Sequence, residues 1–149
     1  MGAKNFRELR CWQRANDLRA EVHAICSISD AAKDFRFCNS FRDAIGSVCR
    51  NISEGFGRKS PGQIVQFFTY ALASLNEVQD HLEECRIRKV LNQSRFEKDW
   101  DMAEHTRAMC LNFMKSHKAR LAATRPGTER CYWYVVPRGT VKTSPEPCP

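Results

Sequence analysis

The sequence predicts an all-α protein: an antiparallel up-down-up-down four-helix bundle followed by an irregular C-terminal tail. Its 149 residues suit one domain of ordinary size, which can bury a core without disulfides. Apolar residues recur every three or four positions in four segments, as on the buried stripe of an amphipathic helix. Short connections between these segments favour antiparallel neighbours. We therefore assign residues 1–123 to the bundle domain and residues 124–149 to a proline-containing tail.

The first helix is expected over residues 6–28, with charged residues between its apolar positions. Its stripe consists of Leu9, Trp12, Ala15, Leu18, Val22 and Ile25. The periodicity is lost over residues 29–33, so these residues are expected to form a connection.

The second helix is expected to begin near Asp34 or Phe35 and to end at Phe56. Its stripe consists of Phe37, Phe41, Ala44, Ile45, Val48 and Ile52. Two glycines lie near its end. Gly55 permits close approach of a neighbouring backbone, and Gly57 suits the left-handed position that often ends a helix.

The third helix is expected to begin with a capping box, in which Ser60 is the N-cap and Gln63 lies three residues later. Pro61 between them has no amide hydrogen to leave unpaired at the first helical position. The stripe then continues to about Cys85 through Ile64, Phe67, Phe68, Ala71, Leu75, Val78 and Leu82.

No charged residue occurs from position 61 to position 76, which is typical of a helix covered on more than one side. Phe67 and Phe68 point about 100° apart, so we do not expect both to face the same core. We therefore predict a homo-oligomer whose interface includes Phe67, Phe68 and Tyr70.

The fourth helix is expected to begin at a second capping box, formed by Ser94 and Glu97, and to continue to about Ala123. Its stripe consists of Phe96, Trp100, Ala103, Met109, Cys110, Phe113 and Met114. Beyond it the composition changes to a short β-prone run at residues 131–136 and three prolines at residues 143–149. This tail is expected to be poorly ordered.

The basic balance of the chain favours an acidic partner. Lysine and arginine number 24 against 17 acids, a formal net charge of +7. Nucleic acid is the first candidate and an anionic membrane surface the second. The longest apolar run, residues 64–75, is too short to span a bilayer, and the N-terminus lacks the apolar core of a secretory signal. We expect a cytoplasmic protein with no membrane partner.

The eight cysteines form no C-x-x-C motif, so the usual zinc-ribbon and thioredoxin signals are absent. His23 with Cys26, and His81 with Cys85, have helical spacing and could in principle ligate a metal. Each pair lacks a second pair at ligand spacing. No cofactor or metal is expected, and a bundle that binds a metal or small molecule is the weakest alternative.

Asn51 and Glu54 lie on one helical face, three residues apart. Glu54 also follows Arg50 by four residues, so the two could form a surface ion pair. No histidine, second acid or nucleophile lies nearby in the sequence, so general acid–base catalysis is not expected. We interpret Asn51 and Glu54 as hydrogen-bonding groups that contact a neighbouring helix or another subunit, and we predict that the protein is not an enzyme.

Basic residues gather on the first helix, on the second helix, beside the second connection and around the third. The expected phosphate contacts are Arg7, Arg10, Arg14, Arg42, Arg50, Arg58, Lys59, Arg86, Arg88 and Lys89. Arg58 and Lys59 precede a helix N-terminus, whose free amides could complete an anion site, although solvated cations beside a turn are an equal alternative. No base-reading module is present, so binding should be independent of sequence and strongly dependent on salt.

Several motifs resemble the four helix bundle protein family, also called the 23S rRNA intervening-sequence protein family. They are Phe6-Arg-Glu-Leu9 with Trp12-Gln13, Ser40-Phe41-Arg42-Asp43-Ala44, Asn51-Ile52-Ser53-Glu54-Gly55 with Gly57-Arg58, and Phe67-Phe68 with Ala71, Ser74-Leu75 and Glu77. The resemblance covers about residues 6–120. It implies a ring-shaped homopentamer of bacterial origin with a basic surface, nucleic-acid binding and no established enzymatic activity. The related accessory variability proteins of diversity-generating retroelements bind a reverse transcriptase and its RNA.

The leading hypothesis is therefore a non-catalytic, oligomeric helical bundle that binds nucleic acid, either RNA or an RNA–protein complex. The alternative is a protein–protein adaptor, such as an accessory protein that binds the reverse transcriptase of a diversity-generating retroelement.

Overall fold

A computed structural model of the chain describes residues 3–123. Its elements are η1 (Phe6–Glu8), α1 (Arg10–Ile25), α2 (Ser29–Ala32), α3 (Phe35–Phe56), α4 (Pro61–Ile87) and α5 (Gln93–Ala123). Every regular element of the described residues is helical, which confirms the all-α prediction. The prediction for residues 124–149 lies outside the described part of the chain. None of the described helices is long and apolar enough to cross a membrane.

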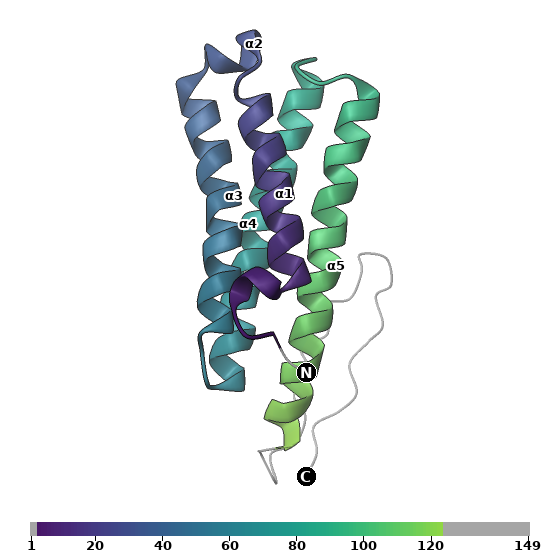
Figure 1. Ribbon diagram of the computed structural model, residues 1–149. Helices are drawn as coiled ribbons and strands as arrows, with labels where there is room; N and C mark the ends of the chain where they lie inside the picture. Colours follow the sequence, from purple (N-terminus) through teal and green to yellow (C-terminus); the bar gives the residue numbers. More distant parts are fainter. Residues whose placement is uncertain (1–2, 124–149) are drawn as a thin grey trace, which may run out of the picture.

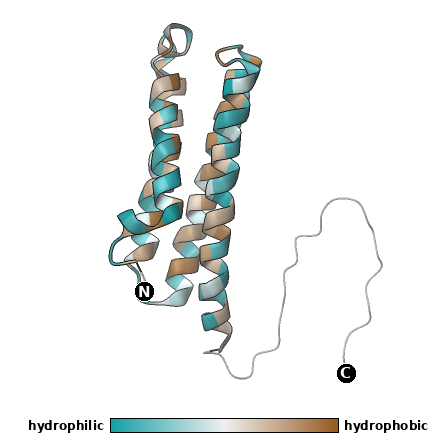
Figure 2. Ribbon diagram, turned by 45° about the vertical axis from the view of Figure 1, so that its right-hand side comes forward, coloured by the Kyte–Doolittle hydropathy of each residue, from teal (hydrophilic) through white to brown (hydrophobic). Residues whose placement is uncertain are grey.

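The four long helices lie side by side, and short connections join them at alternate ends (Figure 1). α1 packs against α3 and α5, and α4 packs against the same two helices. The helices visible in Figure 2 carry both hydrophilic and hydrophobic residues, and the buried residues of each helix recur at helical spacing. The core therefore lies between the four helices.

The predicted stripes supply this core. Leu18, Phe41, Ile45, Phe68 and Leu75 are fully buried, each from a stripe named above. The Phe68 ring stacks on Phe113 of α5, with 4.6 Å between the ring centroids. Gly55 of α3 makes this packing possible, because a Cβ at that position would lie 2.9 Å from a Phe68 ring carbon. The close approach at Gly55 is made by the side chains of Phe67 and Phe68 and not by a neighbouring backbone.

The first helix and the connection after it differ from the prediction. Leu9 has extended backbone (ψ 122°), so residues 6–8 form a separate 3-10 turn and α1 begins at Arg10. Asn5 caps that turn, since its side chain accepts a hydrogen bond from the Arg7 amide. The apolar period runs through Leu9 without interruption, so it gave no sign of the break. Residues 29–32 form the short helix α2.

The helix starts were predicted with mixed success. Asp34 caps α3, with its Oδ1 accepting from the Phe37 amide at 3.0 Å, and Pro61 occupies the first turn of α4 as expected. Ser60 forms no side-chain cap hydrogen bond, so the first capping box is wrong. The second is also wrong, because Asn92 receives the cap hydrogen bond at α5, from the Arg95 amide at 2.9 Å.

Gly57 does not adopt the predicted left-handed conformation. Its φ is −72°, and its amide donates to the carbonyls of Ser53 and Glu54. α3 thus ends by tightening its last turn, which any residue could do. The left-handed residue is instead Lys89, after α4, with φ 56°.

Replacing Lys89 with glycine is expected to stabilise the protein by about 1 kcal/mol, because a side chain in the left-handed region crowds its own carbonyl. The Val90 amide donates to the Cys85 carbonyl at 2.9 Å, a hydrogen bond that requires this turn of the chain. Urea unfolding would measure the change. Arg88→Gly is the control, since Arg88 is right-handed (φ −75°) and glycine there should destabilise. Equal effects of the two substitutions on the free energy of unfolding would contradict the left-handed conformation of Lys89.

Candidate nucleic-acid interface

Charge is unevenly distributed along the bundle. We call one end the basic end: it consists of residues 3–11, the α3–α4 connection with the adjoining helix turns, and the last turns of α5, at the bottom of Figure 1. Its cations are Lys4, Arg7, Arg10, Arg50, Arg58, Lys59, Lys115, Lys118 and Arg120. Within the described residues, its only acids are Glu8 and Glu54.

Both acids are engaged locally. Glu8 accepts hydrogen bonds from the Lys4 amide (2.8 Å) and the Asn5 side chain (2.9 Å). Glu54 pairs with Arg58 at 2.6 Å. In contrast, Arg10, Lys59, Lys115 and Lys118 are exposed, and the described part of the chain gives them no ion pair. The basic end therefore has an excess of positive charge that faces solvent.

We call the opposite end the balanced end: it consists of the end of α1, α2, the start of α3, the end of α4 and the start of α5, where cations and acids lie close together. Arg88 lies 3.1 Å from Asp34 and 3.9 Å from Glu84, and Arg86 pairs with Glu83. The Phe37 amide and Arg88 lower the pKa of Asp34, as expected for a carboxylate held by donors. The predicted contacts Arg86, Arg88 and Lys89 thus lie far from those of the first helix, among acids. The structure does not bring the two predicted groups together.

The predicted contacts on α1 and α3 occupy different settings. Arg7 lies over the Phe6 ring at 5.8 Å, and Arg14 lies one helical turn above Arg10, away from the basic end. Arg42 lies on α3, in the half nearer the balanced end. Arg50 folds back over Gly46, where a Cβ would lie 3.2 Å from its guanidinium.

Glu54 forms its ion pair with a different residue from the predicted one. Arg58 binds it, and the Arg58 guanidinium also lies over the Phe67 ring, 4.6 Å from the centroid. The expected Arg50–Glu54 pair is wrong. Asn51 donates to the Ser47 carbonyl at 2.9 Å, so within this chain it contacts its own helix and not a neighbouring one. At the start of α4, only Lys59 remains exposed and unpaired among the described residues, so the anion-site hypothesis now concerns Lys59.

Lys115, Lys118 and Arg120 were not among the predicted contacts. They lie on the last turns of α5, beside the start of α4, where Gly62 approaches Leu121. The predicted alternation of helix direction already implied that the end of the fourth helix meets the start of the third. Applying that topology to every lysine and arginine would have found them.

The uncharged part of α4 divides between core and surface. Phe68 is fully buried in its own chain, so its assignment to an oligomer interface is corrected. Phe67 is half-buried under Arg58. Tyr70 is 47% exposed, and its hydroxyl accepts a hydrogen bond from Gln66 at 2.8 Å. The surface that this stretch leaves free is uncharged and centres on Tyr70.

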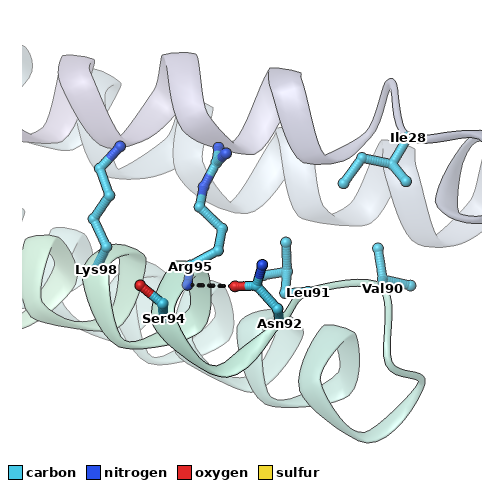
Figure 3. A pocket seen from close by; sticks show the side chains of 7 residues that line it. All are labelled: Ile28, Val90, Leu91, Asn92, Ser94, Arg95 and Lys98. Atoms are coloured by element: carbon cyan, nitrogen blue, oxygen red, sulfur yellow. Dashed lines mark hydrogen bonds between the residues drawn. The ribbon is translucent and has the colours of Figure 1, made fainter.

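A depression of about 440 Å³ lies at the balanced end, between the end of α1 and the start of α5. Its lining residues are Ile28, Val90, Leu91, Asn92, Ser94, Arg95 and Lys98 (Figure 3). Both cations are already paired. Lys98 lies 2.8 Å from Glu21, whereas Arg95 pairs with Glu21 and also lies 2.9 Å from Asp99. The hydrogen bond from Lys98 lowers the pKa of Glu21, whereas burial raises that of Asp99. This depression therefore offers no excess positive charge to a phosphate.

The two predicted histidine–cysteine pairs form no larger ligand set. Among the described residues, no group of three histidine, cysteine or acidic side chains is placed to hold a metal ion. The His81 Nε2 lies 3.1 Å from the Ser40 hydroxyl, and its ring contacts Phe37 and Phe41. Cys85 is buried in the core.

Burial lowers the pKa of His81, against the opposing effects of Asp80, Glu77 and Glu84. The unfolded chain therefore binds a proton first as pH falls below about 6.5, and the folded state loses stability from pH 7 towards pH 5. His81→Gln should make the free energy of unfolding less dependent on pH across this range. Some pH dependence should remain, because burial also lowers the pKa of His117, which is unchanged in this variant. An unchanged slope in His81→Gln, measured by urea unfolding at both pH values, would contradict this.

The fold and its surface define a class: an all-helical bundle with cations concentrated at one end. The chain matches the family model described as 23S rRNA-intervening sequence protein over residues 7–112. It belongs to that family, as its motifs indicated.

A solved structure supports the fold independently. The chain is similar to a protein of unknown function from the S23 ribosomal protein family of Bacteroides thetaiotaomicron VPI-5482. The TM-score is 0.64 at 14% sequence identity, over 70% of this chain and 95% of that chain. At this identity the similarity shows a common fold and no more. A search of curated proteins found no match.

Proposed function

We propose that this protein is a non-catalytic, homo-oligomeric, up-down-up-down four-helix bundle that binds nucleic acid through its basic end. Its ligand in this proposal is RNA or an RNA–protein complex, in the cytoplasm. The main support is the segregation of charge, which leaves Arg10, Lys59, Lys115 and Lys118 unpaired at one end among the described residues. The family name, which refers to intervening sequences of 23S rRNA, points to RNA.

Phosphate backbones supply the affinity in such a mode of binding. Each phosphate that a lysine or arginine neutralises releases condensed counterions, so affinity falls as salt rises. The ion-paired arginines at the balanced end would have to exchange existing partners for phosphates. Arg86 and Arg88 are therefore not retained as contacts in this proposal. Lys89, for which the described part of the chain shows no ion pair, is left out because it lies at the same acid-rich end.

Oligomerisation would strengthen the effect. The surface of α4 around Tyr70 is uncharged and could be covered by a second copy without burying a charge. A ring, with a pentamer as the expected size, would repeat the basic end around one axis and multiply its field. Light scattering tests this part, and a monomer at micromolar concentration would contradict it.

Fluorescence anisotropy with labelled single-stranded RNA and duplex DNA, across a salt series, tests binding itself. A linear fall of log affinity with log salt concentration is expected. Absence of binding at low salt, or affinity that does not change with salt, would reject the proposal.

A second candidate function is a protein–protein adaptor, such as one that binds a reverse transcriptase. Two exposed apolar side chains favour it: Phe35 at the start of α3 (75% exposed) and Ile87 at the end of α4 (64%) lie at the balanced end. Exposed apolar side chains of this size are common anchors in protein interfaces. If this function is correct, Phe35→Ser with Ile87→Ser should abolish capture of a reverse transcriptase encoded beside this protein and leave RNA affinity unchanged.

A further inference from the structure

Two cysteines from opposite ends of the sequence meet near the basic end. Cys11 lies in the first turn of α1 and Cys110 in α5, and each side chain shifts the pKa of the other. Cys11 also lines one hollow with Met109 and Asn112, which flank Cys110 in α5. Cys11 and Cys110 are 4% and 1% exposed, so both belong to the edge of the core. The two thiols thus face each other across the contact between α1 and α5.

A surface hollow reaches Cys11. It measures about 340 Å³ and lies between η1, α1 and α5. Its lining residues are Glu8, Leu9, Arg10, Cys11, Met109, Asn112 and Phe113. Cys110 does not line it. A small reagent that enters the hollow therefore meets Cys11 first, with Cys110 behind it.

The surroundings favour a thiolate at Cys11. The hydrogen bond from Cys110 lowers the pKa of Cys11, while that same contact and burial raise the pKa of Cys110. Arg10 and Glu8 both line the hollow, and Arg107 lowers the pKa of Cys110 from the same helix. A lowered pKa and access are among the conditions that make a cysteine reactive.

A second pair in the same chain provides an internal comparison. Cys26, at the end of α1, and Cys38 of α3 each place their sulfur 3.8 Å from the carbonyl oxygen of the other. Burial raises the pKa of Cys26 to about 12, and neither residue lines the hollow. This pair is close, but burial disfavours the Cys26 thiolate and the hollow does not reach either residue.

We propose that Cys11 and Cys110 form an oxidisable dithiol whose oxidant is a small hydroperoxide. The Cys11 thiolate attacks one peroxide oxygen, the O–O bond breaks, and an alcohol, or water from hydrogen peroxide, leaves. Cys11 becomes a sulfenic acid. The Cys110 sulfur then attacks the Cys11 sulfur, and the hydroxyl leaves with the Cys110 proton as water. One peroxide is reduced by two electrons, and two thiols become one disulfide that joins α1 to α5.

Peptide mapping of the reduced full-length protein tests the proposal. After treatment with equimolar hydrogen peroxide, free thiols are blocked with N-ethylmaleimide and the chain is cut with trypsin. The expected product is a disulfide that links residues 11–14 to residues 108–115, in a protein that runs as a single chain on a non-reducing gel. It should form at least about tenfold faster than a link between residues 20–33 and 37–42, which contain the comparison pair.

Two variants test the order of the steps. Cys110→Ser should accumulate a sulfenic acid at Cys11 that dimedone traps, and Cys11→Ser should give neither the sulfenic acid nor the disulfide. If a variant does not fold, the disulfides mapped in the wild-type protein are sufficient to test the proposal. Absence of the 11–110 disulfide, or its formation no faster than the 26–38 disulfide, would overturn the proposal.

Discussion

Replacing Arg10, Lys115 and Lys118 together with glutamine is expected to weaken RNA binding roughly 100-fold in 0.1 M salt. Each lost phosphate contact lowers the slope of log affinity against log salt by about 0.7 for a single strand, so three lower it by about two. All three side chains are exposed, and the described part of the chain shows no ion pair for them. The substitutions should therefore leave the fold unchanged. Anisotropy titrations at several salt concentrations measure both quantities.

The matched control changes the same charge at the balanced end. Arg86→Gln, Arg88→Gln and Lys89→Gln together remove three cations, two of which are already paired with acids. Exposed ion pairs contribute little to stability, so this variant should also fold. Its affinity for RNA should change less than about threefold and its salt slope by less than about one. If this variant lost as much affinity as the first, charge at the basic end would not be the determinant of binding.

Phe68→Ala is expected to destabilise the protein by about 3–5 kcal/mol, the usual range for a large aromatic side chain removed from a core. Phe68 is fully buried, stacks on Phe113 and fills the space that Gly55 leaves open. Little of the resulting cavity can be refilled, because its walls belong to three different helices. This change is a large share of the stability of an ordinary domain. Urea unfolding followed by circular dichroism measures it.

Phe67→Ala is the control for this second prediction. Phe67 is half-buried and lies under Arg58, so its loss removes part of a surface contact worth about 1 kcal/mol. If Phe67→Ala were as destabilising as Phe68→Ala, the orientation of α4 in the bundle would be wrong. Oligomer size should be recorded for both variants, since only Phe67 lies at the surface near Tyr70.

The hydrophobic pattern predicted the helices well, but their ends less well. Apolar spacing identified most of the buried positions of α1, α3 and α4 because burial imposes the helical period on the sequence. On α5 it was less successful: Phe96, Trp100, Met109 and Phe113 are only partly buried, and the buried residues Asp99, Met102 and Thr106 were missed. The ends depend on single hydrogen bonds, for which several nearby residues compete. Asn92 displaced Ser94 as the cap of α5, and Gly57 adopted a conformation that does not require glycine. The break between η1 and α1 at Leu9 leaves the apolar period intact, so the sequence pattern could not predict it.

The candidate site was predicted only in part, for a physical reason. Sequence spacing shows where cations lie along a helix, but not which acids approach them from another helix. Arg88 pairs with Asp34 across 54 positions of sequence, and Arg95 with Glu21 across 74. These acids neutralise cations around the connection between α4 and α5, a segment that appears strongly basic when the sequence is read alone. Lys115 and Lys118 looked isolated in the sequence, and the fold places them at the same end of the bundle as Lys59.

Ultraviolet cross-linking of the wild-type protein to single-stranded RNA, with identification of the modified peptides, tests the central claim most directly. The nucleotide should be attached to tryptic peptides from the basic end, such as residues 8–10, 51–58 and 108–115. Peptides from residues 90–95 and 99–107, which lie at or towards the balanced end, should remain unmodified. Nucleotides attached mainly to those peptides, or spread evenly over the chain, would contradict binding through the basic end.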